Sequence, residues 1–172
     1  MSELLGREEI LAAFGKLASE LARRRLRVDM FVVGGAAIAI AYSTSRRTRD
    51  VDAVFGDPGE VYEAARAVAR RMGLPHDWLN DAVRSYLLGD DSGARPVYES
   101  DSLQVAVASP QYLLAMKLLA ARPEQDQGDI RLLYGLCGLG SRADGLALLA
   151  RYLPGEDVPE ATVQLLEAMF PG

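Results

Sequence analysis

The amino-acid sequence predicts an α+β fold: a small mixed β-sheet, flanking helices and a helical C-terminal half. Two runs rich in Val, Val28–Val33 and Val51–Phe55, have the composition and length of short buried strands. Apolar residues in Arg7–Arg24 recur at helical spacing, and helical patterns occupy most of the chain after Pro110. Strands are therefore expected only before Pro110.

The segments before Ser109 alternate between helical and extended patterns. In the first of them Ile10, Phe14, Leu17 and Leu21 recur on one helical face. Glycines mark several ends, because Gly-Gly and Gly-Asp-Pro-Gly sequences favour turns. The elements expected in order are a helix over Arg7–Arg24, a strand over Val28–Val33, a helix over Ala36–Tyr42, a basic loop over Ser43–Arg49, a strand over Val51–Phe55, a helix over Val61–Met72 and a further helix over Pro75–Leu88.

The remaining segments are mainly helical. Ser109-Pro110 is a strong helix start, because Ser caps a helix and Pro is favoured in its first turn. The expected elements are a loop over Gly89–Pro96, a hairpin or one broken strand over Val97–Ser100 and Leu103–Ala108, and helices over Gln111–Ala121, Asp126–Leu136, Arg142–Tyr152 and Glu160–Phe170. We expect residues 1–109 to form a core and residues 110–172 a helical part packed on it, within one compact domain.

Composition limits the kinds of site this chain can hold. Its 172 residues are 49% hydrophobic, enough for a packed core, and its net charge of −5 argues against an extended basic surface for duplex nucleic acid. One Cys and one His exclude an internal disulfide and a multi-His metal site. The most apolar stretch, Met30–Ala41, is too short to cross a bilayer, and no targeting segment is evident. We expect a soluble, cytoplasmic protein with no membrane contact.

A strand that runs into Gly34-Gly35 and then a helix predicts an anion site. The two glycines let the backbone approach a ligand closely, and the first N–H groups of the following helix have no partner within it. The alternative is a simple tight turn.

Asp50 and Asp52 are the second candidate feature. Side chains two residues apart on a strand point to the same face. Two carboxylates on one face repel each other unless a cation lies between them. With no second His or Cys, the expected cation is Mg²⁺ or Mn²⁺, bound with the help of substrate phosphates. The alternative is an edge strand whose polar face meets water.

Together these features resemble the core motif of the polymerase-β-like minimal nucleotidyltransferases. The run from Val33-Gly34-Gly35 to Asp50-Val51-Asp52 places a Gly-Gly turn before an Asp-hydrophobic-Asp pair, as in that superfamily. The Gly-Gly pair and the Arg46–Asp52 run look most like the abortive-infection (AbiEii-type) nucleotidyltransferase toxins. The resemblance implies that Gly34 and Gly35 contact a nucleoside triphosphate and that Asp50 and Asp52 ligate the metal. It also implies that Thr48 orders the loop or touches phosphate. Arg46, Arg47 and Arg49 lie in the loop that leads to the Asp pair and could hold phosphates or a polynucleotide acceptor; the alternative is a solvated loop.

A second block, Ser109-Pro110 … Lys117 … Arg122 … Asp126 … Asp129, is similar to the later motif of these toxins. Lys117 follows Leu113 and Leu114 on a largely apolar helix, so its ammonium needs an anionic partner, either a triphosphate or Asp129. By resemblance, Asp129 or Asp126 orients or deprotonates the acceptor. The alternatives are a Lys that extends along a packed helix, an N-cap at Asp126 and a carboxylate favoured by the helix dipole at Asp129.

One departure from the superfamily pattern concerns the third carboxylate that many relatives carry on a later strand. The segment Leu103–Ala108 has no acid, and only Glu99 and Asp101 lie near it. Three alternatives follow: one of these two residues supplies the third acid, Asp129 assists a pair of carboxylates, or activity has been lost.

The resemblance implies an enzyme that transfers a nucleoside monophosphate from a nucleoside triphosphate to an acceptor hydroxyl. The acceptor it implies is tRNA or another RNA, and the role it implies is the toxin of a toxin–antitoxin or phage-defence pair with an antitoxin protein as partner. The alternatives are a small-molecule acceptor, as in antibiotic-modifying relatives, and a degenerate module that binds a nucleotide or a partner.

Overall fold

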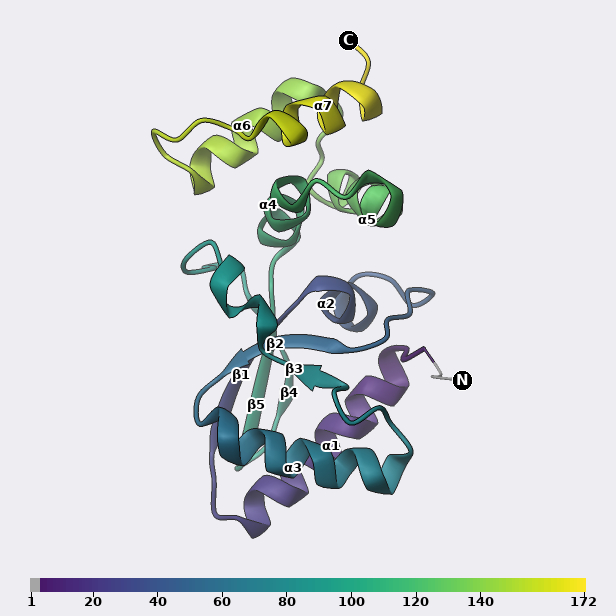
Figure 1. The fold of residues 1–172 in the computed structure, drawn as a ribbon, viewed down its shortest axis with the longest axis vertical. Helices are drawn as coiled ribbons and strands as arrows, with labels where there is room; N and C mark the ends of the chain where they lie inside the picture. Colours follow the sequence, from purple (N-terminus) through teal and green to yellow (C-terminus); the bar gives the residue numbers. More distant parts are fainter. Residues whose placement is uncertain (1–3) are drawn as a thin grey trace. The chain divides into compact units, whose positions relative to one another are not determined.

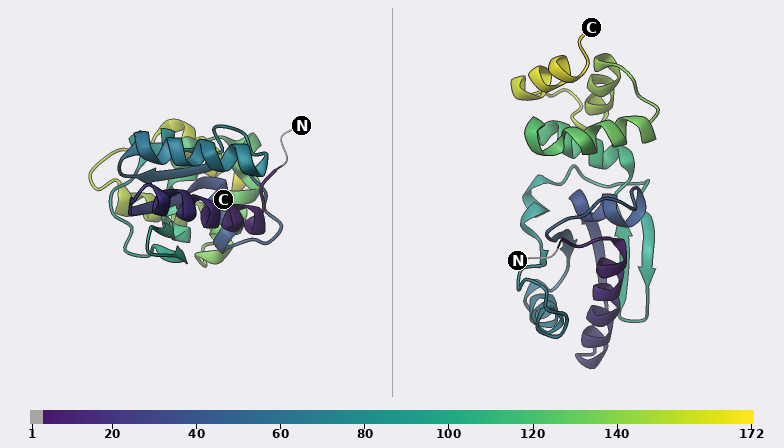
Figure 2. Two further views of the ribbon diagram at one scale, coloured as in Figure 1. Left: turned by 90° about the horizontal axis from the view of Figure 1, so that it is seen from below. Right: turned by 90° about the vertical axis from the view of Figure 1, so that its right-hand side faces the viewer.

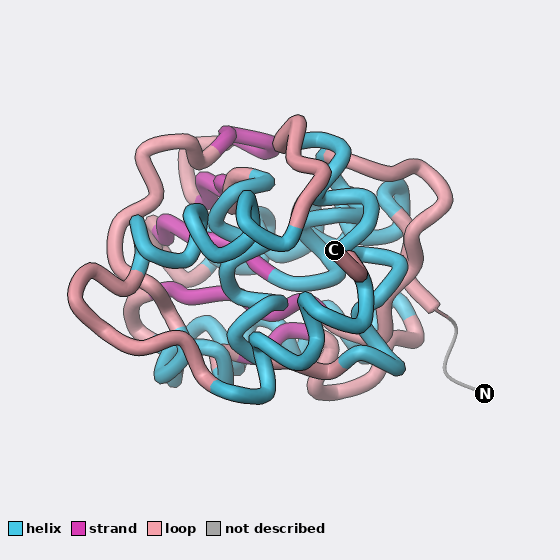
Figure 3. The backbone as a smooth tube through the Cα atoms, turned by 90° about the horizontal axis from the view of Figure 1, so that it is seen from above, coloured by secondary structure: helices cyan, strands magenta, loops and turns pink. Residues whose placement is uncertain are grey.

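The computed structural model describes residues 4–172, and the chain divides into two compact units. One unit, called the sheet unit below, consists of Met1–Ser85 and Gly93–Ala108. The other, called the helical unit, consists of Tyr86–Ser92 and Ser109–Gly172. Helices predominate over strands, as the sequence predicts (Figure 3).

The sheet unit is built on a five-stranded mixed sheet with the strand order β3-β2-β1-β5-β4 (Figure 1). Strand β1 pairs with β2 in antiparallel and with β5 in parallel orientation. The outer pairs are β2 with β3, which is parallel, and β5 with β4, which is antiparallel. The strand bounds are Val28–Val33 (β1), Val51–Phe55 (β2), Leu79–Asn80 (β3), Arg95–Glu99 (β4) and Leu103–Val107 (β5). This architecture confirms the predicted fold class.

The two faces of the sheet differ in burial. Alternate residues of β1, β2 and β5 are buried and form one face of the core, with the side chains of helices that include α1 and α3. Helices α1 and α3 contact each other (Figure 2). The other face, called the open face below, carries partly or fully exposed residues: Asp29, Phe31, Asp52, Val54, Gln104 and Ala106. The helices of this unit are α1 (Arg7–Arg23), α2 (Gly34–Ala41) and α3 (Pro58–Met72).

Most expected elements form close to their predicted bounds, but one does not. The helix expected over Pro75–Leu88 is wrong: the chain there forms β3 and a short 3₁₀ helix over Ala82–Tyr86. Strand β3 forms because Leu79 and Asn80 pair with β2, a nonlocal contact that overrides the local pattern. Trp78 just before it is fully buried and donates from Nε1 to the Ala65 carbonyl at 2.9 Å. Of the two expected forms of the β4–β5 segment, the structure has the hairpin.

The helical unit contains α4 (Pro110–Ala120), α5 (Pro123–Leu136), α6 (Arg142–Tyr152) and α7 (Glu160–Met169). Helix α4 contacts each of the other three. It begins at Ser109, whose hydroxyl accepts from the backbone N–H of Tyr112, so the predicted cap is present. Thr162 of α7 is fully buried and donates to the Leu118 carbonyl at 2.8 Å, which ties α7 to α4. Among the described residues, none of the helices has the length and apolarity needed to span a membrane.

Candidate active site

The Gly34-Gly35 turn lies where β1 ends and α2 begins. Gly34 has φ of +66°, a left-handed conformation that favours glycine. A Cβ added to Gly34 would lie 3.2 Å from Oδ2 of Asp52, so this carboxylate lies directly against the turn. Val33, the N-cap residue, provides no side-chain cap to α2. The first N–H groups of α2 are therefore available to an anion beside Asp52.

Arg46 and Thr48 lie on the other side of the same turn. A Cβ added to Gly35 would lie 3.0 Å from Nη2 of Arg46 and 3.1 Å from Oγ1 of Thr48. Thr48 donates from that hydroxyl to the Asp50 carbonyl at 3.1 Å and exchanges two backbone hydrogen bonds with Leu5, at 2.7 and 2.9 Å. The loop before β2 is thus fixed against the turn rather than solvated throughout.

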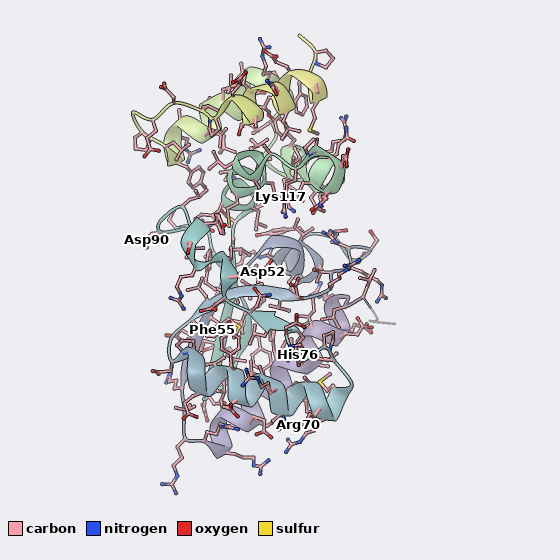
Figure 4. All side chains as sticks on the ribbon, viewed as in Figure 1. Asp52, Phe55, Arg70, His76, Asp90 and Lys117 are labelled. Atoms are coloured by element: carbon pink, nitrogen blue, oxygen red, sulfur yellow. The ribbon has the colours of Figure 1, made fainter. Side chains whose placement is uncertain are left out.

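Asp52 lies in β2, and Asp50 directly precedes this strand. Asp52 is on the open face and pairs with Val33, and Figure 4 shows it on β2 close to α2. Asp50 accepts a hydrogen bond of 3.1 Å from the side-chain amide of Asn80 on β3. Burial raises the pKa of Asp50, an effect that the Asn80 hydrogen bond opposes. Asp50 therefore holds its negative charge at an energetic disadvantage that a nearby cation would relieve.

The donor set around the turn suits a hard divalent cation. The carboxylates of Asp50 and Asp52 are oxygen ligands of the kind that Mg²⁺ and Mn²⁺ take. Among residues 4–172 no group of three or more His, Cys, Asp or Glu side chains forms a closed metal site.

The pairing of the strands shows whether Glu99 can supply the third carboxylate that many relatives carry. Strand β5 lies beside β1, but its open-face residues are Gln104 and Ala106. Glu99 pairs with Gln104, which in turn pairs with Asp29. Asp29 is four residues before Val33, the partner of Asp52, so about 13 Å of strand separates the two rows at about 3.3 Å per residue. Glu99 therefore lies too far along the sheet to share a metal with Asp52.

A hollow of about 510 Å³ occupies the open face beyond Asp52. Its floor includes Phe31 and Val54, which pair across β1 and β2 in the row next to that of Asp52. The row of Asp29, Gln104 and Glu99 lines its far end. This hollow combines an apolar floor with two carboxylates, and neither carboxylate has a hydrogen-bond or ion-pair partner within the described chain.

The later motif forms an ion-pair cluster in the helical unit. Nζ of Lys117 lies 2.6 Å from Oδ1 of Asp126 and 3.0 Å from Oδ2 of Asp129. Nε of Arg122 lies 3.0 Å from the second oxygen of Asp126. The side chains of Lys117, Asp126 and Asp129 are 9%, 5% and 9% exposed. The anionic partner that Lys117 needs is thus supplied by two aspartates of α5.

The predicted site residues fall into two groups. The sheet unit brings Gly34, Gly35, Arg46, Thr48 and Asp52 around one turn, with Asp50 two residues from Asp52. The helical unit brings together Lys117, Asp126 and Asp129. Sequence reasoning missed Asn80, because a predicted helix covered it. The apolar pair Trp78-Leu79 directly before a polar Asn-Asp pair is the signal of a short edge strand that could have revealed it.

A protein-family model described as "Nucleotidyltransferase of unknown function (DUF6036)" matches residues 9–134, a range that contains both groups of candidate residues. Among solved structures, the chain is similar to an antigenic nucleotidyltransferase-like protein from Paracoccidioides brasiliensis, with 16% sequence identity and a TM-score of 0.41 over 99% of this chain and 100% of that one. Curated proteins yielded no match.

Proposed function

Because the chain belongs to the nucleotidyltransferase family described as DUF6036, we propose that it transfers a nucleoside monophosphate from a nucleoside triphosphate to an acceptor hydroxyl. The acceptor oxygen attacks the α-phosphorus, the bond from that phosphorus to the bridging oxygen breaks, and pyrophosphate leaves with the electron pair. The hydroxyl proton passes to a base. The observation that carries the proposal is the Asp52 carboxylate against the left-handed Gly34 turn.

Different residues around the turn are proposed to bind the triphosphate and the metal. Backbone N–H groups at Gly34 and Gly35 receive the triphosphate, because the start of α2 attracts anions and no Cβ blocks the approach. The Arg46 guanidinium lies where it can pair with phosphate oxygens, and Thr48 holds the loop in place. Asp50 and Asp52 would hold Mg²⁺ or Mn²⁺, which when bound neutralises charge on the phosphates.

The ion-pair cluster of the helical unit has a proposed role as well. The resemblance assigns Lys117 to neutralising the triphosphate and Asp129 or Asp126 to the acceptor, and transfer assays with substitutions at these residues test that assignment. The two short contacts to Lys117 support a positioning role for Asp126 and Asp129, which fix the direction of the Lys117 ammonium. Substitution of Lys117 should then lower the rate of transfer beyond any loss of folded protein.

Transfer assays test the proposal directly. Purified protein is incubated with Mg²⁺ and each α-labelled nucleoside triphosphate, with total RNA or a panel of small hydroxyl compounds as acceptors. We expect labelled acceptor with wild-type protein and none with Asp52→Asn. If wild-type protein labels no acceptor and Mg²⁺ with nucleotide leaves its melting temperature unchanged, the proposal is wrong. A rise in melting temperature without transfer would instead identify a degenerate nucleotide-binding module.

For the acceptor, the proposal is tRNA or another RNA, with the protein acting as the toxin of a toxin–antitoxin or phage-defence pair. The resemblance to abortive-infection toxins supports this, together with the basic residues Arg46, Arg47 and Arg49 in the loop that leads to the Asp pair. Growth arrest on expression of wild-type protein but not of Asp52→Asn, relieved by a co-expressed antitoxin protein, would support the toxin role.

The hollow on the open face favours a second candidate acceptor. Its apolar floor and the carboxylates of Asp29 and Glu99 suit a small molecule that carries amino or hydroxyl groups better than a polyanion. Paired substitution of Asp29→Asn and Glu99→Gln separates the two candidates. Loss of transfer to small hydroxyl compounds that carry amino groups, with transfer to RNA intact, would assign the hollow to a small-molecule acceptor.

A further inference from the structure

Seven arginines lie on neighbouring elements of the sheet unit, and ion pairs from Glu20 to Arg71 and from Arg24 to Glu60 join two of these elements, α1 and α3. They lie in the last turn of α1 and just after it, in the segment before β1, and in the second half of α3, and all seven are exposed. Helices α1 and α3 pack against each other there, and Figure 4 labels one of the seven on α3. The group, called the arginine surface below, consists of Arg23, Arg24, Arg25, Arg27, Arg66, Arg70 and Arg71.

Only part of this charge is neutralised. The buried carboxylate of Glu20 contacts both Arg23 and Arg71, while Glu60 pairs with Arg24 and Glu63 with Arg66. Glu20 thus fixes two guanidiniums at once. The three others have no acidic partner in the described part of the chain: Arg25, Arg27 and Arg70. The arginine surface therefore carries a net charge of +4 within a chain of net charge −5.

Arg25 carries a second observation. It follows the C-cap residue Arg24 and has φ of +58°, in the left-handed region where the residue after a helix is usually Gly. The helix dipole accounts for a cation at Arg23 but not for a strained arginine beyond the helix end. Gly at this position would relieve the backbone strain, so the charge of Arg25 can be removed by Arg25→Gly without loss of stability.

We propose that the arginine surface binds the phosphate backbone of the RNA acceptor. This inference rests on the proposed transfer to RNA. Guanidinium groups pair with phosphate oxygens through two parallel N–H donors, and a local concentration of them attracts a polyanion even when the whole protein is acidic. A compact protein or small metabolite offers no comparable row of anions.

The distance between the arginine surface and the Gly34-Gly35 turn gives the minimum length that the RNA must span. Arg27 directly precedes β1 and the Gly34-Gly35 turn directly follows it, so the two sites lie at opposite ends of a six-residue strand. Such a strand spans about 20 Å. An RNA bound at both sites must therefore be a structured or extended molecule, with its body at the arginine surface and its reacting end at Asp52.

RNA binding without nucleotide tests the proposal separately from transfer. Fluorescence anisotropy with a labelled tRNA-sized RNA compares wild-type protein, the triple variant Arg25→Gly/Arg27→Gln/Arg70→Gln, and the matched control Arg7→Gln/Arg131→Gln/Arg151→Gln. We expect the first triple variant to weaken binding at least tenfold and to lower the slope of log K against log salt by about 2, since each phosphate contact contributes about 0.7 to 0.9. The control should change affinity less than twofold. Equal losses in both variants, or no loss in either, would overturn the proposal.

Two further measurements separate folding and catalysis from binding. Arg25→Gly alone should bind RNA more weakly while its melting temperature equals or exceeds that of wild type, so unfolding cannot explain the loss. Asp52→Asn should bind RNA as wild type does but transfer nothing. If wild-type protein binds RNA through these arginines yet labels no RNA, the proposed transfer fails and the binding surface stands. If the same arginines bind anionic vesicles but no RNA, the binding surface itself is wrong.

Discussion

The side-chain amide of Asn80 donates a hydrogen bond of 3.1 Å to the Asp50 carboxylate, which links the short edge strand β3 to the Asp pair of β2. Asn80→Ala removes this donor, so the pKa of Asp50 should rise further and its carboxylate should lose its fixed orientation. Groups that orient metal ligands typically change affinity or activity by about 10- to 100-fold. We expect the Mg²⁺ concentration needed for half-maximal transfer to rise by a factor in this range. An unchanged Mg²⁺ dependence would remove Asn80 from the site.

Asp50→Asn should stabilise the metal-free protein and abolish the response to metal. The substitution removes a partly buried charge while its amide oxygen can still accept from Asn80. Thermal unfolding with and without Mg²⁺ and nucleotide measures both effects. We expect the melting temperature of wild type to rise when Mg²⁺ and nucleotide are added. The melting temperature of the variant should be higher than that of metal-free wild type and should not change on this addition. A variant less stable than metal-free wild type would contradict it.

The raised pKa of Asp50 also sets a direction for pH dependence. Because its folded-state pKa lies above the unfolded value of 3.8, the folded protein holds this proton more tightly. The stabilisation from this group is complete below the unfolded pKa and is lost as the pH rises through the folded pKa. Metal needs the ionised form, so Mg²⁺ affinity should fall as the pH drops toward the raised pKa. Isothermal titration with Mg²⁺ between pH 4 and pH 7 checks this, and Asp50→Asn, which is expected not to bind the metal, gives the background heat at each pH.

Gly34→Ala and Gly35→Ala should both impair nucleotide binding, for different reasons. At Gly34 the added Cβ is strained by the left-handed backbone, by about 1 kcal/mol, and approaches Asp52. At Gly35 it approaches the Arg46 and Thr48 side chains and would displace the guanidinium proposed to pair with phosphate. Gly59→Ala is the matched control, since nothing lies within 4 Å of its added Cβ. Nucleotide affinity should fall for the first two variants, and only Gly34→Ala should also lower stability clearly.

Lys117→Met should destabilise the helical unit strongly. It leaves the buried carboxylates of Asp126 and Asp129 without their shared cation, and breaking a buried pair in this way typically costs about 3–5 kcal/mol. Denaturant unfolding measures the change. Lys16→Met, at the only other lysine of the chain, serves as the control. The double variant Lys117→Met/Asp129→Asn should recover part of the loss, and no recovery would contradict the ion-pair assignment.

The sequence predicts the parts of the fold that local patterns determine. Strands β1 and β2 have their expected bounds because their Val-rich runs end at glycines or at polar residues. The same patterns locate Gly34, Asp50 and Asp52. Strand β3 escapes prediction because two residues carry no periodicity and become a strand only through their pairing with β2.

Contacts between distant residues account for the rest of what sequence reasoning missed. The hydrogen bond from Asn80 to Asp50 depends on the register of β3 against β2, which no local signal contains. The pairing of Lys117 with Asp129 is predictable from the need for an anionic partner. Its shorter contact with Asp126 depends on how α5 folds back on α4, and a capping role is the simpler prediction for that residue.

The two backbone hydrogen bonds between Leu5 and Thr48 have a practical consequence for work on this protein. Leu5 is buried and holds the loop that approaches Gly35, so the first described residues contribute to the candidate active site even though they lie far from it in the sequence. An affinity tag or fusion partner joined close to Leu5 would disturb the backbone hydrogen bonds between Leu5 and Thr48 and thereby alter the measured activity. Expression with the tag after Gly172 leaves this pairing undisturbed, and it is the arrangement in which activity measurements should be made.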